Sequence, residues 1–177
     1  MKLHFEKSWH LAIFVFCVIL AIASWMIAFY FWSKLPQTIP THFSFSGQAD
    51  SWSQKSLWYM LLVPLLQTVL VIGFGFLYLK PQYTNIPSTL FLITYEKTKR
   101  NIAYKLIRNM LVVSLAFVGV FFTYLTFALN YAAFHGSISL MPLVLIVWLV
   151  ALFAWLIWYN VKVYRTTMKF IADNKSK

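Results

Sequence analysis

A long apolar stretch near the start of the chain restricts the possible folds. From Trp9 to Trp32 the sequence reads WHLAIFVFCVILAIASWMIAFYFW, without a single Asp, Glu, Lys or Arg. At a rise of about 1.5 Å per residue, a helix of this length crosses the roughly 30 Å hydrocarbon layer of a bilayer. Backbone groups in lipid need hydrogen-bond partners within their own segment, so the stretch predicts a membrane-spanning helix. It is also too long for the apolar core of a signal peptide, and we expect it to be retained.

Three further stretches have the same character. They cover about 57–79, 110–130 and 140–161, so the sequence predicts a single domain, 1–177, that is an all-α integral membrane protein with four transmembrane helices. The composition agrees, because 61% of the residues are hydrophobic and 11% are charged. Soluble domains have about 45–50% apolar and about 25% charged residues. The single cysteine, Cys17, excludes an intrachain disulfide.

The distribution of basic residues predicts the orientation in the membrane. With both termini in the cytoplasm, only Lys34 and Lys55 of the 15 Lys and Arg residues lie outside the cell. The positive-inside rule therefore favours an N-in, C-in, multi-pass protein of the cell membrane. The net charge of +11 does not indicate nucleic-acid binding, because the basic residues flank apolar stretches in short groups and do not cover one soluble face.

A basic amphipathic segment precedes the third span. Over 95–109, Ile102, Leu106 and Ile107 can share one helical face. The basic residues lie mostly on the other faces: Lys97, Arg100, Lys105 and Arg108. We expect a cytoplasmic helix that either lies on the inner leaflet or continues into the third span. Pro87 is typical of the start of such a helix.

The loop over 34–56 differs from a plain connector. Between Leu35 and Lys55 it reads LPQTIPTHFSFSGQADSWSQK. Polar and apolar residues alternate over 41–45, which predicts a short strand, and Ser46-Gly47 is typical of a turn. We expect a small folded cap whose larger apolar side chains pack on helix ends: Phe43, Phe45 and Trp52.

Fixed spacings within this loop resemble a known family. The pattern consists of Pro36, Ile39, Pro40, His42, Phe43, Gly47, Asp50 and Lys55. It is similar to the pattern of a bacterial membrane domain, domain of unknown function 1648, which also occurs in longer SdpI-like immunity and signalling proteins. Ser44 stands where the family pattern usually has Asn. The resemblance implies an immunity or sensor role for this shorter chain.

Two residues of the loop, His42 and Asp50, carry the most chemistry, and three interpretations are open. They can stabilise the fold of the loop, bind a peptide or another ligand, or join His135 in a metal site. Because these three residues have no short fixed spacing, the metal signal is weak, and we expect no metal and no cofactor. The candidate residues for partner binding or for structuring the loop are Pro36, Pro40, His42, Phe43, Gly47, Asp50, Trp52 and Lys55.

The spans contain few polar side chains. Gln67 carries an amide well inside the second span, and a buried amide needs a partner, so we expect it to bridge helices. Ser24 and Ala28 form a small-xxx-small pair for helix packing, and Gly73 and Gly75 are expected to allow close approach. We expect His10 to lie at the membrane interface.

No catalytic or transport signature is present. Intramembrane proteases use paired Asp, a Ser/His pair or a zinc motif, and coupled transporters use ionisable residues within spans. The whole chain holds 4 acidic residues, and none lies in a predicted span. We therefore expect a non-enzymatic binding protein whose outer loop contacts a secreted peptide or an envelope partner. The alternative is an accessory subunit of a larger membrane complex such as an exporter.

Overall fold

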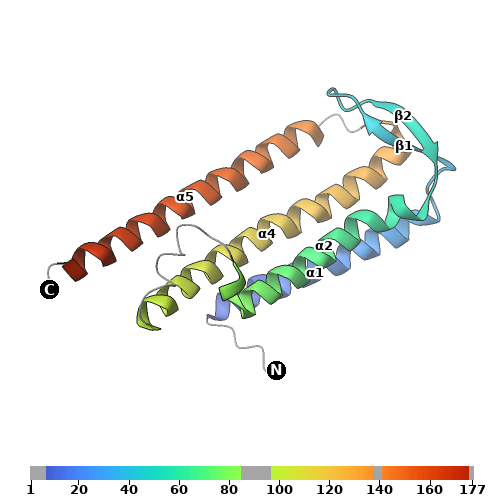
Figure 1. Cartoon of the computed structure of the whole chain (residues 1–177). Helices are drawn as coiled ribbons and strands as arrows, with labels where there is room; N and C mark the ends of the chain where they lie inside the picture. The colour runs from blue at the N-terminus through green and yellow to red at the C-terminus, as the bar shows by residue number, and fades with distance from the viewer. Residues whose placement is uncertain (1–6, 85–96, 138–140, 176–177) are drawn as a thin grey trace.

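The computed structural model describes residues 7–84, 97–137 and 141–175 (Figure 1). The described elements are four long helices, a β-hairpin and one short 3-10 helix. In chain order they are α1 (Ser8–Trp32), β1 (Thr38–Phe43), β2 (Ala49–Gln54), α2 (Leu57–Leu79), η1 (Pro81–Tyr83), α4 (Lys97–His135) and α5 (Met141–Lys175). The hairpin lies at the end of the helices opposite to the start of α1 and the end of α5 (Figure 1).

The four predicted spans are confirmed as helices. The parts that are long and apolar enough to cross a membrane are Ser8–Trp32, Leu57–Leu79, Arg100–His135 and Pro142–Thr166. A helix satisfies its own backbone hydrogen bonds, which is why these apolar sequences form no other structure in lipid. The chain is therefore a multi-pass membrane protein.

The last two helices extend well beyond the predicted spans. α4 begins at Lys97 instead of about 110, and α5 continues past 161 to Lys175. The basic segment over 97–109 is thus the first part of α4. It continues directly into the third span, which was one of the two expected arrangements. Ala103 and Ile107 of this segment are buried, so the packed face of α4 begins before the apolar stretch. The expected helix start at Pro87 lies outside the described residues.

The hairpin corrects the all-α prediction. β1 and β2 are antiparallel, with Thr38 opposite Gln54 and Phe43 opposite Ala49, and the register shifts on either side of His42. We expected one strand over 41–45, but the structure has a strand at 38–43 and a second at 49–54. The second strand has no buried residue, so it has no apolar alternation from which to predict it. It forms because the turn at 44–47 returns the chain alongside β1.

The tightest packing lies between α1, α2 and α4, and small residues make it possible. The buried face of α1 contains Cys17, Ala21, Ser24 and Ala28. Across from it, a Cβ atom at Gly119 of α4 would lie 3.4 Å from the Cys17 sulfur. Small side chains of this kind let transmembrane backbones approach closely.

Gly73 does not provide the close approach that we expected of it. A Cβ atom at Gly73 would face open space, whereas one at Gly75 would lie 3.2 Å from the ring of Phe14. Two residues correspond to a rotation of about 200° around a helix, so the two glycines face nearly opposite directions. The glycine at the contact between α1 and α2 is therefore Gly75.

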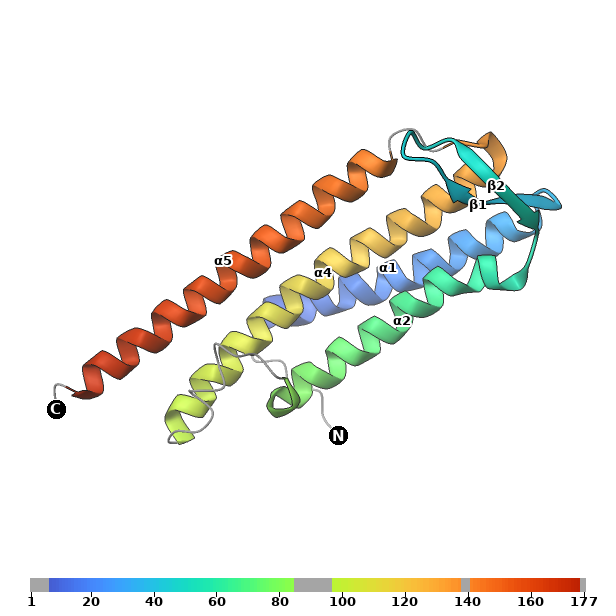
Figure 2. The same ribbon diagram turned by 45° about the horizontal axis from the view of Figure 1, so that its top comes forward.

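The last helix stands apart from the others. Among the described residues, α5 contacts α4 but neither α1 nor α2. Figures 1 and 2 both show α5 beside α4, on the side away from α1. Within the described parts of the chain, α2 and α5 therefore do not contact each other.

Candidate functional site

The hairpin is seated on the helices through apolar side chains. Phe43 packs against Ala128 and Ala132 of α4. Leu35 and Ile39, from the chain leading into β1 and from β1 itself, are buried together with Ala133. These contacts hold the hairpin across the ends of α1 and α4.

The turn that follows α4 holds the hairpin from a second side. The Ala49 amide donates a hydrogen bond to the Gly136 carbonyl at 3.0 Å, and Gln48 forms a β-bridge with Ser137. Gly136 has a φ of 67°, and a Cβ atom there would lie 3.6 Å from the ring of Trp52. We did not predict this contact. A glycine directly after a long apolar helix is a C-cap signal that indicates where α4 ends, but not what packs on it.

Lys55 attaches the hairpin to the end of α1. Its Nζ donates hydrogen bonds to the carbonyl oxygens of Trp32 at 2.5 Å and Leu35 at 3.3 Å, and lies 4.4 Å from the centre of the Trp32 ring. The last carbonyl groups of a helix lack partners within the helix and attract cations. Lys55 therefore structures the loop. In the described structure it does not pair with the carboxylate of Asp50, which has a different partner.

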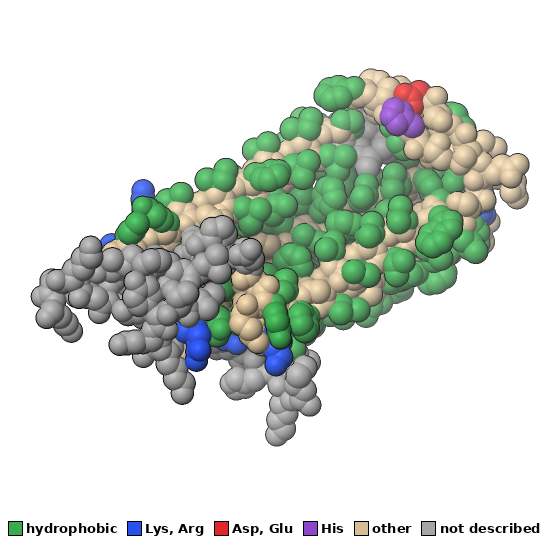
Figure 3. Space-filling model, viewed as in Figure 1, with side chains coloured by type: hydrophobic (Ala, Val, Ile, Leu, Met, Phe, Trp, Pro, Cys, Tyr) green, Lys and Arg blue, Asp and Glu red, His purple; other side chains and the backbone are tan. Residues whose placement is uncertain are grey.

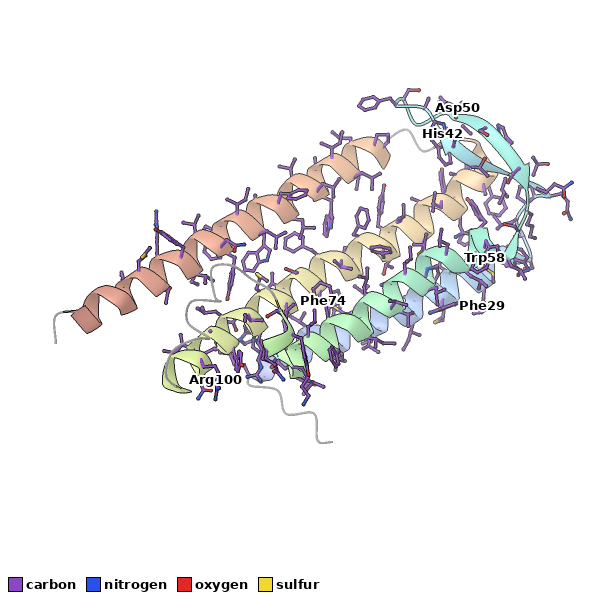
Figure 4. All side chains as sticks on the ribbon, viewed as in Figure 1. Phe29, His42, Asp50, Trp58, Phe74 and Arg100 are labelled. Atoms are coloured by element: carbon purple, nitrogen blue, oxygen red, sulfur yellow. The ribbon has the colours of Figure 1, made fainter. Side chains whose placement is uncertain are left out.

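That partner is His42. His42 Nδ1 and Asp50 Oδ1 are 2.5 Å apart, and the two side chains are 69% and 45% exposed. Figure 4 shows them together on the hairpin, far from Arg100 at the other end of the bundle. An ionised carboxylate only accepts hydrogen bonds, so Nδ1 carries the proton and Nε2 is left for another contact.

The side of the hairpin that faces the helices covers an apolar groove of about 730 Å³. The groove is lined by residues 40–45 and Gly47, by Tyr59, Leu62 and Val63 of α2, by Leu129 of α4, and by Pro142 and Leu145 of α5. The Tyr59 hydroxyl donates a hydrogen bond of 2.6 Å to the Leu129 carbonyl. Figure 3 shows hydrophobic side chains over this face of the molecule, below the histidine and the acidic side chain of the hairpin.

Two aromatic residues of the hairpin behave differently from each other. Trp52 lies against Gly136, so it packs on a helix end as we expected. Phe45, in the turn, is 89% exposed and packs on no helix end, which corrects our expectation for that residue. Phe45 borders the groove from the turn but stays exposed, because the register shift and the turn interrupt the alternation seen in the sequence.

Gln67 lies in a polar cluster in the middle of the bundle. Ser24 Oγ donates to Gln67 Oε1 at 2.5 Å, and Gln67 Nε2 donates to Thr123 Oγ1 at 3.1 Å and to the Gly119 carbonyl at 3.2 Å. Ser24, Gln67 and nearby Ala28 are fully buried. The cluster joins α1, α2 and α4 by hydrogen bonds.

A second buried polar cluster lies at the opposite end from the hairpin, and sequence reasoning missed it. His10, which we expected at the interface, is fully buried. Its Nδ1 is 2.9 Å from the Tyr78 hydroxyl, and its Nε2 is 2.9 Å from Asn109 Oδ1. His10 lies near the start of one span and Tyr78 near the end of the next. Consecutive spans run in opposite directions, so these two residues lie at similar depths, and this placement could have predicted their contact.

No metal cluster was found in the described parts of the chain, where no three His, Cys, Asp or Glu side chains group together. His135 hydrogen bonds with the Tyr131 carbonyl of its own helix at 3.0 Å and stacks on the Tyr131 ring. His42 pairs with Asp50, so the two histidines have different partners.

The fold and the site define a multi-pass membrane protein with a hairpin over an apolar groove. Residues 19–68 match the family model described as Domain of unknown function (DUF1648). This part of the chain therefore contains that domain, which confirms the resemblance seen in the loop. The match runs from α1 through the hairpin into α2, and it includes the His42–Asp50 pair and Gln67. No curated protein and no solved structure matched the chain.

Proposed function

We propose that this chain is a non-enzymatic binding protein of the cell membrane, with its hairpin outside and both termini in the cytoplasm. The basic residues support this orientation. Lys34 and Lys55 lie at the hairpin end. The basic side chains described at the other end are Lys7, Lys80, Arg100, Lys105, Arg108, Lys162, Arg165 and Lys169. Such an excess is typical of the cytoplasmic side.

The observation that carries the proposal is the exposed surface of the hairpin, with the His42–Asp50 pair and Phe45. An exposed ion pair contributes only about 0–1 kcal/mol to stability. Exposed Phe45 gains almost nothing from burial, while aromatic residues are enriched in protein interfaces. Neither feature is needed much for folding, so both are available to a partner.

The partner that we propose is a secreted peptide, or the envelope component that such a peptide attacks. The resemblance of the loop pattern to one that also occurs in SdpI-like immunity proteins suggests this class of partner. The His42 ring offers a hydrogen bond and the Phe45 ring offers apolar contact, a combination that suits a peptide with mixed side chains.

Photocrosslinking from the hairpin tests the proposal. Benzoylphenylalanine replaces Phe45 in one variant and Ile72, which faces away from the core in α2, in another. We expect a specific adduct from position 45 in the native host, and its yield should fall in His42→Ala or Asp50→Ala backgrounds that accumulate normally. Pro36→Ala and Gly47→Ala are folding controls, since loss of the protein itself would indicate a structural role.

The second candidate is an accessory subunit of a larger membrane complex. The observation in its favour is α5, which contacts α4 but no other described helix and exposes large apolar residues along its length: Leu143, Val147, Val150, Phe153 and Ile157. A stoichiometric membrane partner in mild-detergent purifications, together with no adduct from Phe45, would favour this candidate over the first.

A further inference from the structure

We propose that the groove beneath the hairpin binds one acyl chain of a phospholipid from the surrounding bilayer. His42 and Phe45, which belong to the surface proposed above for a partner, also border this groove. The two proposals are tested by different variants, because the apolar walls of the groove come from α2, α4 and α5. The open side, the lining and the rim of the groove each point to this ligand.

The open side of the groove faces the hydrocarbon layer. Its walls come from α2 and α5, which do not contact each other among the described residues. Leu62, in the α2 wall, lies inside a membrane-spanning helix and is 50% exposed. Further along α2, the exposed Leu66 and Val69 continue this apolar surface. The groove is thus continuous with the surface that lipid chains already cover.

The lining of the groove suits a hydrocarbon chain better than a peptide. Leu62, Val63, Leu129 and Leu145 offer no hydrogen-bonding groups, and the Tyr59 hydroxyl is already bonded to a carbonyl. A peptide segment would bring N–H and C=O groups that lose water without gaining partners, which is unfavourable. An acyl chain has no such groups. The volume of about 730 Å³ lies within the range of about 300–1,000 Å³ that is typical of small-molecule sites.

The rim of the groove has the polarity of a phospholipid. Thr41, His42 and Ser44 of the hairpin border it at the end where the helices leave the apolar layer. The glycerol and phosphate groups of a lipid whose chain fills the groove would lie beside these side chains. Apolar walls below and polar side chains above therefore match both parts of one amphiphile.

Native mass spectrometry of the full-length protein tests this proposal. The protein is taken up in nanodiscs of palmitoyl-oleoyl phosphatidylglycerol and phosphatidylethanolamine, then released into mild detergent, and the retained lipid is counted. We expect wild type to keep one phospholipid. Leu62→Trp, which fills the groove from the α2 wall, should lower the retained fraction at least tenfold.

The matched control is Leu66→Trp, one turn further along the same helix, where Leu66 is 44% exposed and does not line the groove. It should retain lipid as wild type does. Leu145→Trp, from the α5 wall, provides an independent second variant if Leu62→Trp does not fold. Equal retention in all variants would mean that the lipid lies elsewhere on the surface, and a retained peptide mass in place of lipid would also overturn the proposal.

Discussion

At the residue scale, Gln67 shows how one amide can join three helices. It accepts from Ser24 and donates to Thr123 and Gly119, so all of its hydrogen-bonding groups are used within the bundle. Interhelical hydrogen bonds in membranes contribute modestly, because the unfolded chain in lipid also finds partners.

The Ser24–Gln67 bond should therefore have a small but measurable energy. In a double-mutant cycle of Ser24→Ala and Gln67→Leu, we expect a coupling free energy of about 0.6–1.7 kcal/mol. Reversible unfolding in mixed detergent micelles measures it. In a control cycle, Ile72→Ala replaces Ser24→Ala. Because Ile72 faces lipid, its effect and that of Gln67→Leu on the free energy of unfolding should be additive. A coupling of zero between Ser24 and Gln67 would show that the bond does not stabilise the bundle.

His10 allows a comparison between two histidines. His10→Leu removes hydrogen bonds to Tyr78 and Asn109 from a fully buried site, and we expect a loss of about 1–3 kcal/mol. In the described structure His135 is exposed and hydrogen bonds with a carbonyl of its own helix, so His135→Leu should stay within about 0.5 kcal/mol of wild type. Thermal unfolding in detergent distinguishes them, and equal effects would contradict the role of His10.

At the scale of the elements, the contact between α1 and α2 depends on one glycine. Leucine at position 75 would press into the ring of Phe14, whereas leucine at 73 would extend into open space. We expect Gly75→Leu to lower stability by about 1–3 kcal/mol. Gly73→Leu should be neutral or stabilising by up to about 1 kcal/mol, since leucine is the better helix former. If Gly73→Leu lowered the free energy of unfolding more than Gly75→Leu in an unfolding titration, the contact between α1 and α2 would lie elsewhere.

The hairpin depends on Lys55 for its connection to α1. In Lys55→Met, the carbonyl groups of Trp32 and Leu35 lose a charged donor, which is worth about 1.5–3 kcal/mol. We expect hydrogen exchange of hairpin amides such as Ala49 to become at least about tenfold faster. Lys34→Met, at the same end but with Nζ over the Tyr30 ring, should leave the exchange unchanged. Similar exchange in both variants would show that the hairpin is held without Lys55.

At the scale of the whole molecule, the proposed orientation places the hairpin and the end of α5 on opposite sides of the membrane. A membrane-impermeant maleimide should label Ser46→Cys in intact cells, but Lys169→Cys only after the cells are made permeable. The native Cys17 is fully buried, so wild type should stay unlabelled. The opposite pattern would invert the orientation and place the hairpin inside the cell.

The sequence by itself determined the four helices and the domain. Hydropathy along the chain is a local property, so the bounds of α1 and α2 follow from it almost to the residue. α4 and α5 extend further because contacts between helices, which hydropathy does not report, continue beyond the lipid layer. The spacing from Pro36 to Lys55 identified the domain, because it is also contained in one short segment.

Only the tertiary structure decided which residues meet. Of the candidate residues, it paired His42 with Asp50, placed Lys55 on α1, and turned Phe45 and Gly73 away from the packing that we expected. It also formed β2, buried His10 and separated α5 from α2, which opened the groove. The His42–Asp50 pair and β2 lie within one hairpin, but they depend on how its turn and register are formed. The contacts of His10 and Lys55 join segments far apart in the chain, and the apolar composition of a span does not state which of its faces another helix will cover.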